Sequence, residues 1–332
     1  MDDLNTFKKI LKKEFENARF FTGEDLPVVK SNYTGSLRLD ILLQYPFFEG
    51  AIVELFGESS SGKTTVSLSV LNQAALKDNN KKLLYLDQEM RLRSSLIDTF
   101  PVLKNRLEII QAPNGNEALR IAELWLKQFP GSIVVIDSVD ALLPDNDKEI
   151  GESQVGNLPR LMSDGCRKLA RACATSSSTI IFLNQIRSKI GAYGNPDTTS
   201  GGKALSFYAS QRIQLMPIIA NTKIQDANGT IIGHKVRFKI VKNSVTVPFV
   251  EGEFPLIYGK GIDTVDELID LACDIGILQK DGNYILIEDK KRPPKTVKDM
   301  ARADKDFFNK ILKEVKMLYP ETYQNVEWWR TK

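Results

Sequence analysis

Cysteine and histidine are scarce in this chain of 332 residues. The three cysteines, Cys166, Cys173 and Cys273, form no CxxC pair and are too few for a disulfide framework or a zinc site. Free cysteines fit a reducing compartment, so we expect a protein of the cytoplasm. The single histidine, His234, stands beside a predicted turn, and we expect it to be structural or exposed.

Long apolar runs and a strong charge of either sign are also missing. No stretch approaches the roughly 18 apolar residues of a membrane helix, and "MDDLNTFKKILKKEF" lacks the apolar core of a signal peptide, so we expect no membrane partner. With 45 basic and 42 acidic residues the net charge is only +3, and any affinity for nucleic acid must come from local clusters. The 42% of hydrophobic residues is ordinary for a soluble globular protein with one large core.

Apolar strands and helical stretches alternate from about residue 50 to 215. Continuous apolar strands bounded by helices are typical of a parallel sheet that is covered on both faces, so we predict an α/β fold. The expected strands are 51–57, 82–87, 107–112, 132–138 and 179–185, with helices at 64–76 and 116–129 among those between them. Two further strands, 211–219 and 234–243, flank the hairpin dipeptide Asn228-Gly229.

The two ends of the chain predict smaller appendages. Apolar residues at helical spacing over 4–21 indicate an amphipathic helix, and 26–31 reads as a short extended segment; both must pack on the core or dock onto a neighbouring copy. The tail predicts a helix at 264–276, a strand at 283–288, a linker or exposed loop at "KKRPPK" and a final helical stretch. We therefore divide the chain into an N-terminal arm (1–32), a core (33–262) and a small C-terminal α+β domain (263–332).

The segment "GESSSGKT", residues 57–64, matches the phosphate-binding loop GxxxxGK[ST] and lies between a predicted strand and a predicted helix. Glycines let backbone N–H groups fold around a β-phosphate at a helix N-terminus, Lys63 can neutralise β- and γ-phosphate charge, and the Thr64 hydroxyl can bind Mg²⁺. The expected nucleotide-binding residues here are Gly57, Glu58, Ser59, Ser60, Ser61, Gly62, Lys63, Thr64 and Thr65.

Acidic residues follow two other predicted strands. Asp137 ends "SIVVID", where a carboxylate would hold Mg²⁺ through water, so we predict Thr64 and Asp137 as the metal-binding pair. Asp87 and Glu89 follow "LLYL", and a hydrolase needs one carboxylate that orients the attacking water. From the residues alone, either Asp87 or Glu89 could be the carboxylate that orients the water, and strand alternation favours Glu89. The pattern predicts a protein that uses Mg²⁺ and ATP.

Residues 187–203 follow a core strand with four glycines and three basic residues and no apolar periodicity. A connection of about 17 residues without structure is uncommon in a compact domain, and such loops are usually functional or disordered. Arg187 and Lys189 can neutralise phosphates, Gly201 and Gly202 allow close backbone approach to a strand, and Tyr193 can stack on a base. Arg167, in "GCRK", is a further candidate for contact with phosphates.

Together these motifs resemble the bacterial RecA recombinase family. The matching stretches occur in family order from about residue 33 to 263 and include "GESSSGKTT", "VVIDSVDAL", "EIGESQVG", "FLNQIRSKIG", "GNPDTTSGGKALSFYASQRI" and "EFPLIYGKGI". The resemblance implies a RecA-like P-loop core, a helical filament on single-stranded DNA with ATP between subunits, homologous pairing with double-stranded DNA, and strand exchange in recombination and repair. It also implies single-strand-binding and loader proteins as partners.

The same resemblance assigns roles to particular residues. Segments 149–156 and 187–203 look like the two DNA-binding loops of the family, which adds Val155 and Thr199 to the expected DNA contacts. Gln185 matches a glutamine that senses the γ-phosphate and couples it to the second loop. The residues implied at the subunit interface are Phe207, Arg212 and Lys242, the last reaching the γ-phosphate of the neighbouring subunit.

The chain also departs from the family pattern. Ser244 replaces the second lysine of the usual KNK stretch, and Ser206 replaces a basic residue at the subunit contact. Arg93 and Leu96 stand where the family has an aspartate and a tyrosine against adenine, although Tyr258 matches a tyrosine near the nucleotide. The acidic tail is missing, and the basic excess over residues 290–332 predicts contact with duplex DNA. These divergent ends favour a phage or mobile-element version of the family in a bacterial cell.

Three other function classes have to be weighed against a recombinase. A hexameric DNA-translocating ATPase shares the core, but the "TTSGGKALSFYAS" loop argues against it. A regulatory filament protein that binds ATP and DNA with little strand exchange is supported by Ser244 and by the changes on the adenine side. A small-molecule kinase lacks a second substrate signature. The leading hypothesis is a DNA-dependent ATPase, converting ATP to ADP and phosphate, with Glu89, Lys63, Gln185 and Lys242 as its catalytic residues.

Overall fold

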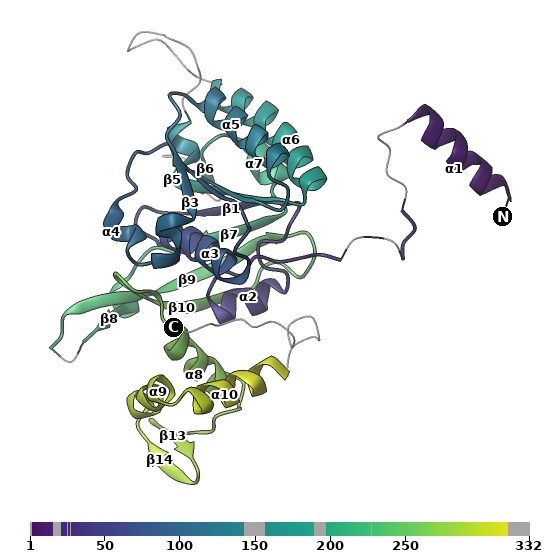
Figure 1. Ribbon diagram of the computed structural model, residues 1–332. Coiled ribbons are helices and arrows are strands. Elements are labelled where there is room, and N and C mark those ends of the chain that lie inside the picture. Colours follow the sequence, from purple (N-terminus) through teal and green to yellow (C-terminus); the bar gives the residue numbers. More distant parts are fainter. Residues whose placement is uncertain are drawn as a thin grey trace. The chain divides into compact units, whose positions relative to one another are not determined.

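A computed structural model describes residues 2–15, 21–24, 26, 28–142, 157–188, 197–226 and 228–317 (Figure 1). The chain divides into two compact units, Met1–Lys30 and Ser31–Lys332. Within the described residues no helix is long and apolar enough to cross a membrane.

The first unit contains α1, Asp2–Glu14. This is shorter than the helix expected over 4–21, of which 16–20 lie outside the described residues. Its apolar side chains at Leu4, Phe7 and Ile10 are exposed. Among the described residues of 26–31 no strand is present, and Leu26 and Val28 are also exposed.

The second unit is built around one large sheet. Its strands are β1 (Ile52–Gly57), β2 (Leu83–Asp87), β3 (Leu107–Ile110), β4 (Ile133–Asp137), β5 (Thr179–Ser188), β6 (Asp197–Thr199), β7 (Gln211–Leu215), β8 (Lys223–Gln225), β9 (Ile231–Asn243), β10 (Glu251–Ile257) and β11 (Gly261–Ile262). The helical elements among them are α2 (Leu37–Leu43), α3 (Lys63–Lys77), α4 (Ser94–Ile97), η1 (Pro101–Asn105), α5 (Gly115–Gln128), η2 (Val139–Ala141), α6 (Asn157–Ser176), α7 (Lys203–Tyr208) and η3 (Ala220–Thr222).

The strand order is β11-β10-β9-β7-β1-β5-β4-β2-β3, with β6 paired to β5 and β8 paired to β9. All neighbours from β7 to β3 run parallel, whereas β9, β10 and β11 extend the sheet in antiparallel fashion. The predicted mostly parallel α/β fold is therefore confirmed. A hairpin does enclose Asn228-Gly229, but it joins β8 to β9, whereas the expected flanking strand 211–219 ends at Leu215.

Successive residues of the central strands point to opposite faces of the sheet and enter two separate cores. Val53 and Leu55 of β1 join a cluster with α2 and α3, whereas Ile52 joins a cluster with α5, α6 and α7. In β2 the same alternation places Tyr85 in the first of these clusters and Leu84 in the second. Figure 1 shows these helices on the two sides of the strands. Burial on both faces explains why the strands read as continuous apolar runs.

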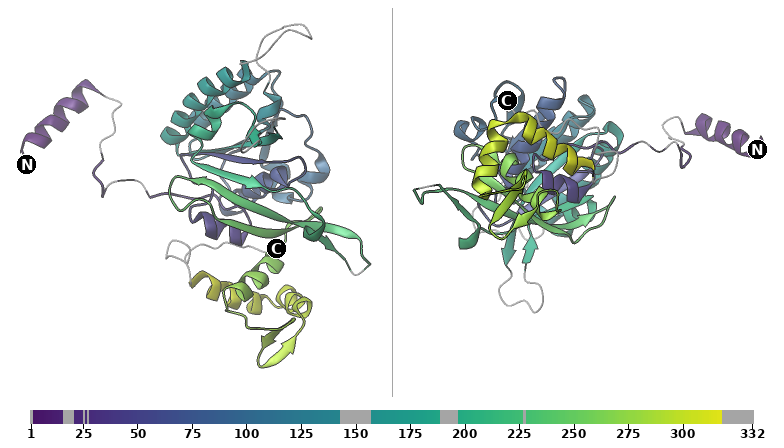
Figure 2. Two further views of the ribbon diagram at one scale, coloured as in Figure 1. Left: turned by 180° about the vertical axis from the view of Figure 1, so that it is seen from behind. Right: turned by 90° about the horizontal axis from the view of Figure 1, so that it is seen from below.

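The C-terminal segment forms a third core, and Figure 2 shows its elements, coloured from green to yellow, grouped together. They are α8 (Thr264–Asp274), β12 (Lys280–Asp281), β13 (Tyr284–Ile287), β14 (Lys290–Arg292), α9 (Pro294–Ala303) and α10 (Lys305–Met317). The expected linker at "KKRPPK" is wrong. Arg292 pairs with Ile285 across a hairpin, and Pro294 opens α9, because proline fits the first helical turn, where no N–H partner is needed.

A buried carboxylate joins this C-terminal core to the start of α2. Glu267 of α8 is 1% exposed and accepts hydrogen bonds from the Ser36 hydroxyl at 2.5 Å and from the backbone N–H groups of Leu37 at 2.9 Å and Arg38 at 3.0 Å. Burial raises the pKa of Glu267 to about 7, although these three donors favour its anionic form. The first N–H groups of α2 are thus capped by a residue 230 positions away.

We predict that Glu267→Ala lowers the free energy of unfolding by roughly 3 kcal/mol, because it leaves three buried donors without their acceptor. Urea denaturation followed by circular dichroism measures this change. Glu251→Ala, which breaks an exposed ion pair with Lys239, is the matched control and should change stability by less than about 1 kcal/mol. Equal losses in both variants would contradict the capping role.

Candidate functional site

The carboxyl ends of four parallel strands meet at one edge of the sheet and bring the predicted polar residues together. In the register, Gly57 at the end of β1 pairs with Gln185 of β5, and Asp87 at the end of β2 pairs with Asp137 at the end of β4. Crevices at this edge are the usual ligand sites of open α/β sheets. The candidate site is therefore made by strand ends that come from widely separated parts of the sequence.

The phosphate-binding loop turns sharply between β1 and α3. A Cβ atom at Gly57 would lie 2.2 Å from the carbonyl oxygen of Leu215, so only glycine fits beside β7. Gly62, directly before α3, has φ +98°, a conformation that favours glycine. Glu58, Ser59 and Ser60 between them are exposed, which leaves this turn open to a ligand.

Lys63 is buried at the start of α3, and its ammonium donates to the carbonyl oxygens of Gly57 at 2.9 Å and Glu58 at 2.6 Å. Burial lowers its pKa, and the nearby carboxylates of Asp137 and Glu89 act in the opposite direction. The positive charge of Lys63 thus lies inside the turn, where it is held by two backbone carbonyls that an anionic phosphate can replace.

Asp137 receives two hydroxyl donors. Tyr85 donates to its Oδ2 atom at 2.5 Å, and Thr64 donates to the same atom at 3.3 Å. Burial raises the pKa of Asp137 to about 6, and the Tyr85 hydrogen bond lowers it. A hydroxyl and a carboxylate in contact at the loop suit a hard cation such as Mg²⁺. Within the described residues no cluster of three or more His, Cys, Asp or Glu side chains could hold a metal, so a cation here would take its other ligands from phosphates and water.

The structure separates the two carboxylates that follow β2. Asp87 is 1% exposed, and its oxygens accept from the backbone N–H groups of Arg91 at 3.1 Å and Leu92 at 3.2 Å and from the Gln111 amide at 3.0 Å. Its acceptors are occupied in holding the turn after β2. Asp87 is therefore a structural residue, and Glu89 is left as the candidate for water activation.

Glu89 faces the end of β4 and the end of β5. Its Oε1 atom accepts from the Ser138 hydroxyl at 2.5 Å and from the side-chain amide of Gln185 at 3.2 Å, and its Oε2 atom accepts from Arg91 at 3.3 Å. The peptide bond between Asp137 and Ser138 is cis. The arrangement links Glu89 directly to Gln185, the residue that precedes the 187–203 loop by two positions.

A hollow of about 370 Å³ lies beside the phosphate-binding loop. Its lining residues are Thr65, Ser95, Leu96, Thr99, Leu256, Ile257, Tyr258, Gly259 and Gly261. Tyr258 and Leu96 thus reach one pocket, and Arg93 instead donates to the carbonyl oxygen of Met90 at 3.1 Å. His234, buried as expected for a structural residue, has its ring centroid 5.7 Å from that of Tyr258. Neither imidazole nitrogen has a hydrogen-bond partner within the described residues.

The 187–203 loop is more ordered at its ends than the sequence predicts. Residues 186–188 of β5 pair antiparallel with Asp197–Thr199 of β6, and α7 begins at Lys203. The expectation of about 17 unstructured residues is therefore wrong for the two ends of the loop. Gly201 and Gly202 have φ +80° and +75°, and a Cβ at Gly201 would lie 2.9 Å from Val139 and 3.0 Å from Met162. Glycine is needed at 201 for packing as well as for any approach to DNA.

Several expected DNA contacts lie outside the described residues. These are Val155 and the rest of 149–156, Lys189 and Tyr193; the side chain of Arg187 is not described, although its backbone pairs with Thr198. Of the others, Thr199 is half-buried in β6. Arg167 is exposed on α6 and forms an ion pair with Asp164 at 3.3 Å.

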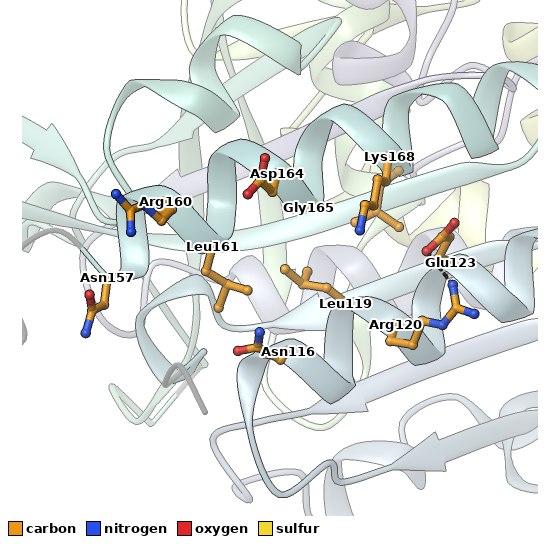
Figure 3. Close-up of a pocket in the computed structure, with 11 residues that line it drawn as sticks. Asn116, Leu119, Arg120, Glu123, Asn157, Arg160, Leu161, Asp164, Gly165 and Lys168 are labelled. Carbon is orange, nitrogen blue, oxygen red and sulfur yellow. Dashed lines mark hydrogen bonds and ion pairs between the residues drawn. The ribbon is translucent and has the colours of Figure 1, made fainter. Parts of the chain in front are cut away.

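Sequence reasoning missed two exposed cations on the same helix as Arg167. Arg160 and Lys168 of α6 line a cavity of about 360 Å³ between α5 and α6, together with Asp164 (Figure 3). Their positions at 160, 164, 167 and 168 share one helical face, because residues three or four apart are neighbours on a helix. That spacing is a signal in the sequence that could have found Arg160.

The three residues implied at a subunit interface have different surroundings. Phe207 of α7 is 76% exposed. Arg212 instead has an internal partner: its Nε donates at 2.5 Å to Glu54, which is fully buried, and its guanidinium lies 4.7 Å from the centre of the Phe56 ring. The Lys242 ammonium donates to the carbonyl oxygens of Ser206 at 3.1 Å and Phe207 at 2.8 Å, near the end of α7.

Comparison with known proteins gives one consistent result. A family model described as the RecA N-terminal domain matches residues 5–263. The chain is 39% identical to Protein RecA of Chloroherpeton thalassium over 327 residues, covering 95% of this chain and 89% of that protein. It is 36% identical to Protein RecA of Chlorobium limicola over 331 residues, covering 97% and 93%. It is also 36% identical to Protein RecA of Porphyromonas gingivalis over 303 residues, covering 89% and 86%.

We predict that Gly201→Ala lowers the free energy of unfolding by roughly 2–4 kcal/mol, from left-handed strain plus overpacking against Val139 and Met162. Gly229→Ala is a matched control, because Gly229 also has φ +80° but meets nothing within 4 Å. Gly229→Ala should lower the free energy of unfolding by about 1 kcal/mol. Thermal melts of both variants test this, and a Gly201 variant no worse than the control would show that the close contacts relax without cost.

Proposed function

Since the chain belongs to the RecA recombinase family, we propose that the strand-end site binds Mg²⁺-ATP and that the 187–203 loop couples its hydrolysis to single-stranded DNA. Family membership makes the chain a DNA-dependent ATPase and a strand-exchange enzyme of DNA recombination and repair, which binds ATP and DNA and forms filaments. The observation that best supports the residue assignment is the hydrogen-bonded contact between Glu89 and Gln185. It joins the hydrolytic side of the site to the strand that leads into the loop.

In this proposal the phosphates of ATP lie on the turn from Gly57 to Thr65, and Lys63 exchanges its two carbonyl acceptors for β- and γ-phosphate oxygens. Thr64 and Asp137 would hold the Mg²⁺, which would supply positive charge beside the phosphates. Glu89, already bonded to the Ser138 hydroxyl, orients the attacking water and accepts its proton. The base lies in the hollow lined by Tyr258 and Leu96.

Gln185 is proposed to report the γ-phosphate to the loop. Its amide can donate to a phosphate oxygen or to Glu89, so a phosphate competes with the 3.2 Å contact that it makes in the structure. Lys242 is proposed to reach the γ-phosphate of a neighbouring subunit. With Ser244 two positions on, only one cation is offered there, so we expect slower turnover than in relatives with two lysines.

DNA contacts are proposed along the two loops and α6. Arg167, Arg187 and Lys189 neutralise phosphates, which makes binding independent of sequence and sensitive to salt. Val155, Tyr193, Thr199, Gly201 and Gly202 are the remaining candidates, and Arg160 joins them on its helical position. Residues 290–332 carry twelve basic and six acidic side chains, which favours contact with duplex DNA.

Filament assembly is proposed to use α1 and the exposed Phe207. The apolar residues Leu4, Phe7 and Ile10 of α1 are exposed, and a helix with such a face gains stability by docking on a neighbouring copy. We further propose a cytoplasmic location in a bacterial cell, phage-encoded or chromosomal, and partners among single-strand-binding and loader proteins. The comparisons with known proteins favour neither a helicase-like motor nor a regulatory filament protein.

We expect Glu89→Gln to abolish ATP hydrolysis in the presence of single-stranded DNA, by about a hundredfold or more, because an amide cannot accept the proton of water. ATP binding should persist, since Lys63 and the loop remain. Hydrolysis is measured by phosphate release with and without DNA, and binding by a fluorescent ATP analogue. Residual hydrolysis near that of the unmodified protein would exclude Glu89 as the base.

We expect Phe7→Asp to prevent long filaments on single-stranded DNA, because a charge on the apolar face of α1 opposes docking. Electron microscopy with ATP and DNA measures filament length. Lys8→Asp is the matched control on the neighbouring position of the same helix, and it should leave filaments present. Filaments of normal length on Phe7→Asp would contradict the proposed role of α1.

A further inference from the structure

Asp140 stands in η2, three residues after Asp137, and its carboxylate joins two elements that the proposed function treats separately. Its Oδ1 atom accepts from the hydroxyl of Ser200, in the turn that follows β6. Its Oδ2 atom accepts from the backbone N–H of Gln185 at 3.3 Å. One side chain therefore touches both the backbone of the proposed γ-phosphate sensor and the stem of the proposed DNA loop.

Neighbouring contacts fix the same turn from other directions. Asn184 donates to the carbonyl oxygen of Ser200 at 3.1 Å and to buried Glu54 at 2.8 Å, and its own oxygen shares the N–H of Gln185 at 2.9 Å. Gly201 then packs against Val139 and Met162. Ser200 is 8% exposed, so its hydroxyl has little access to water as an alternative partner for its proton. The contacts that Asp140 accepts from the Ser200 hydroxyl and from the Gln185 N–H are both charge-assisted and partly buried.

We propose that Asp140 is a positioning residue that ties the stem of the 187–203 loop, through Ser200, to the backbone of Gln185, so that loop and sensor move together. The inference rests on the proposed function, in which Gln185 responds to the γ-phosphate and the loop responds to DNA. Asp140 contacts neither ligand in this scheme. Asp140 transmits a displacement of Gln185 to the stem of the loop, because the two oxygen atoms of its carboxylate can hold two donors that belong to different elements.

The arrangement has consequences that differ from those of a merely structural carboxylate. Without Asp140 the phosphate-binding loop and the contact between Glu89 and Gln185 remain, and the larger charge effects of Asp137 and Glu89 on Lys63 persist, so DNA-free hydrolysis and the KM for ATP should change little. DNA should still bind through its basic residues. What is lost is the increase in kcat that single-stranded DNA produces.

The experiment compares ATP hydrolysis by the full chain and by Asp140→Ala, Asp140→Asn and Ser200→Ala, each with and without a saturating poly(dT) strand. We expect Asp140→Ala to reduce the DNA-stimulated kcat by about tenfold, as loss of a charge-assisted hydrogen bond implies, with little change in DNA-free kcat or in KM. Asp140→Asn should recover part of the stimulation, because its one amide oxygen can accept from the Ser200 hydroxyl or from the Gln185 N–H, whereas its NH₂ group cannot accept. Asp281→Ala removes an exposed carboxylate paired with Lys291 and should match the unmodified protein.

A double variant makes the test specific. If Asp140 acts through Ser200, the variant with both Asp140→Ala and Ser200→Ala should be no worse than Asp140→Ala alone. Normal stimulation in Asp140→Ala would overturn the inference, and so would equal losses of DNA-free and DNA-stimulated hydrolysis together with a lowered Tm. Additive losses in the double variant would overturn the route through Ser200. An unmodified protein that hydrolyses ATP without stimulation by DNA would instead refute the proposed function.

Discussion

The alignment of strand ends in the parallel part of the sheet is the constraint on which the rest of this structure depends. Because β1, β5, β4 and β2 end at the same edge, Gly57 stands beside Gln185 and Asp137 stands beside Asp87. A slip of one residue in any of these strands would turn its polar terminus to the opposite face and its apolar side chains into the wrong core. Two apolar cores, one on each face, hold the register against such a slip.

Much of this could be read from the sequence because the signals are local. The five expected strands are mostly apolar, and each has a glycine, aspartate or glutamine within two residues of its end, so both the sheet and its polar edge were predictable. The phosphate-binding loop is a contiguous motif. The hairpin around Asn228-Gly229 is equally local, since its loop is closed by hydrogen bonds between Asp226 and Thr230 and between Gly229 and Asp226, and Gly229 supplies a φ of +80°.

The remainder depends on contacts between distant residues, which no local pattern contains. The sequence favours Glu89 over Asp87, but it does not show the contact with Gln111 that makes Asp87 structural or the contact with Ser138 that turns Glu89 toward the site. Glu267 caps α2 from 230 residues away. The β14 strand within "KKRPPK" is charged on every residue and has no apolar alternation, so only its pairing with β13 makes it a strand. In each case a partner far along the chain decides what the residue does.

The cations near α7 show how a family pattern and the contacts of an individual chain must be combined. Arg212 and Lys242 are both implied at a subunit contact, yet Arg212 is already neutralised by fully buried Glu54. Removing a partner from such a pair leaves an uncompensated charge, which is costly, so Arg212 is not free to serve a second anion. Among the described residues the Lys242 ammonium donates to two carbonyl oxygens at the end of α7, and neutral acceptors are readily exchanged for a phosphate. We therefore propose that Lys242, and not Arg212, is the cation offered to a neighbouring subunit, and its release would free the end of the helix that presents exposed Phe207.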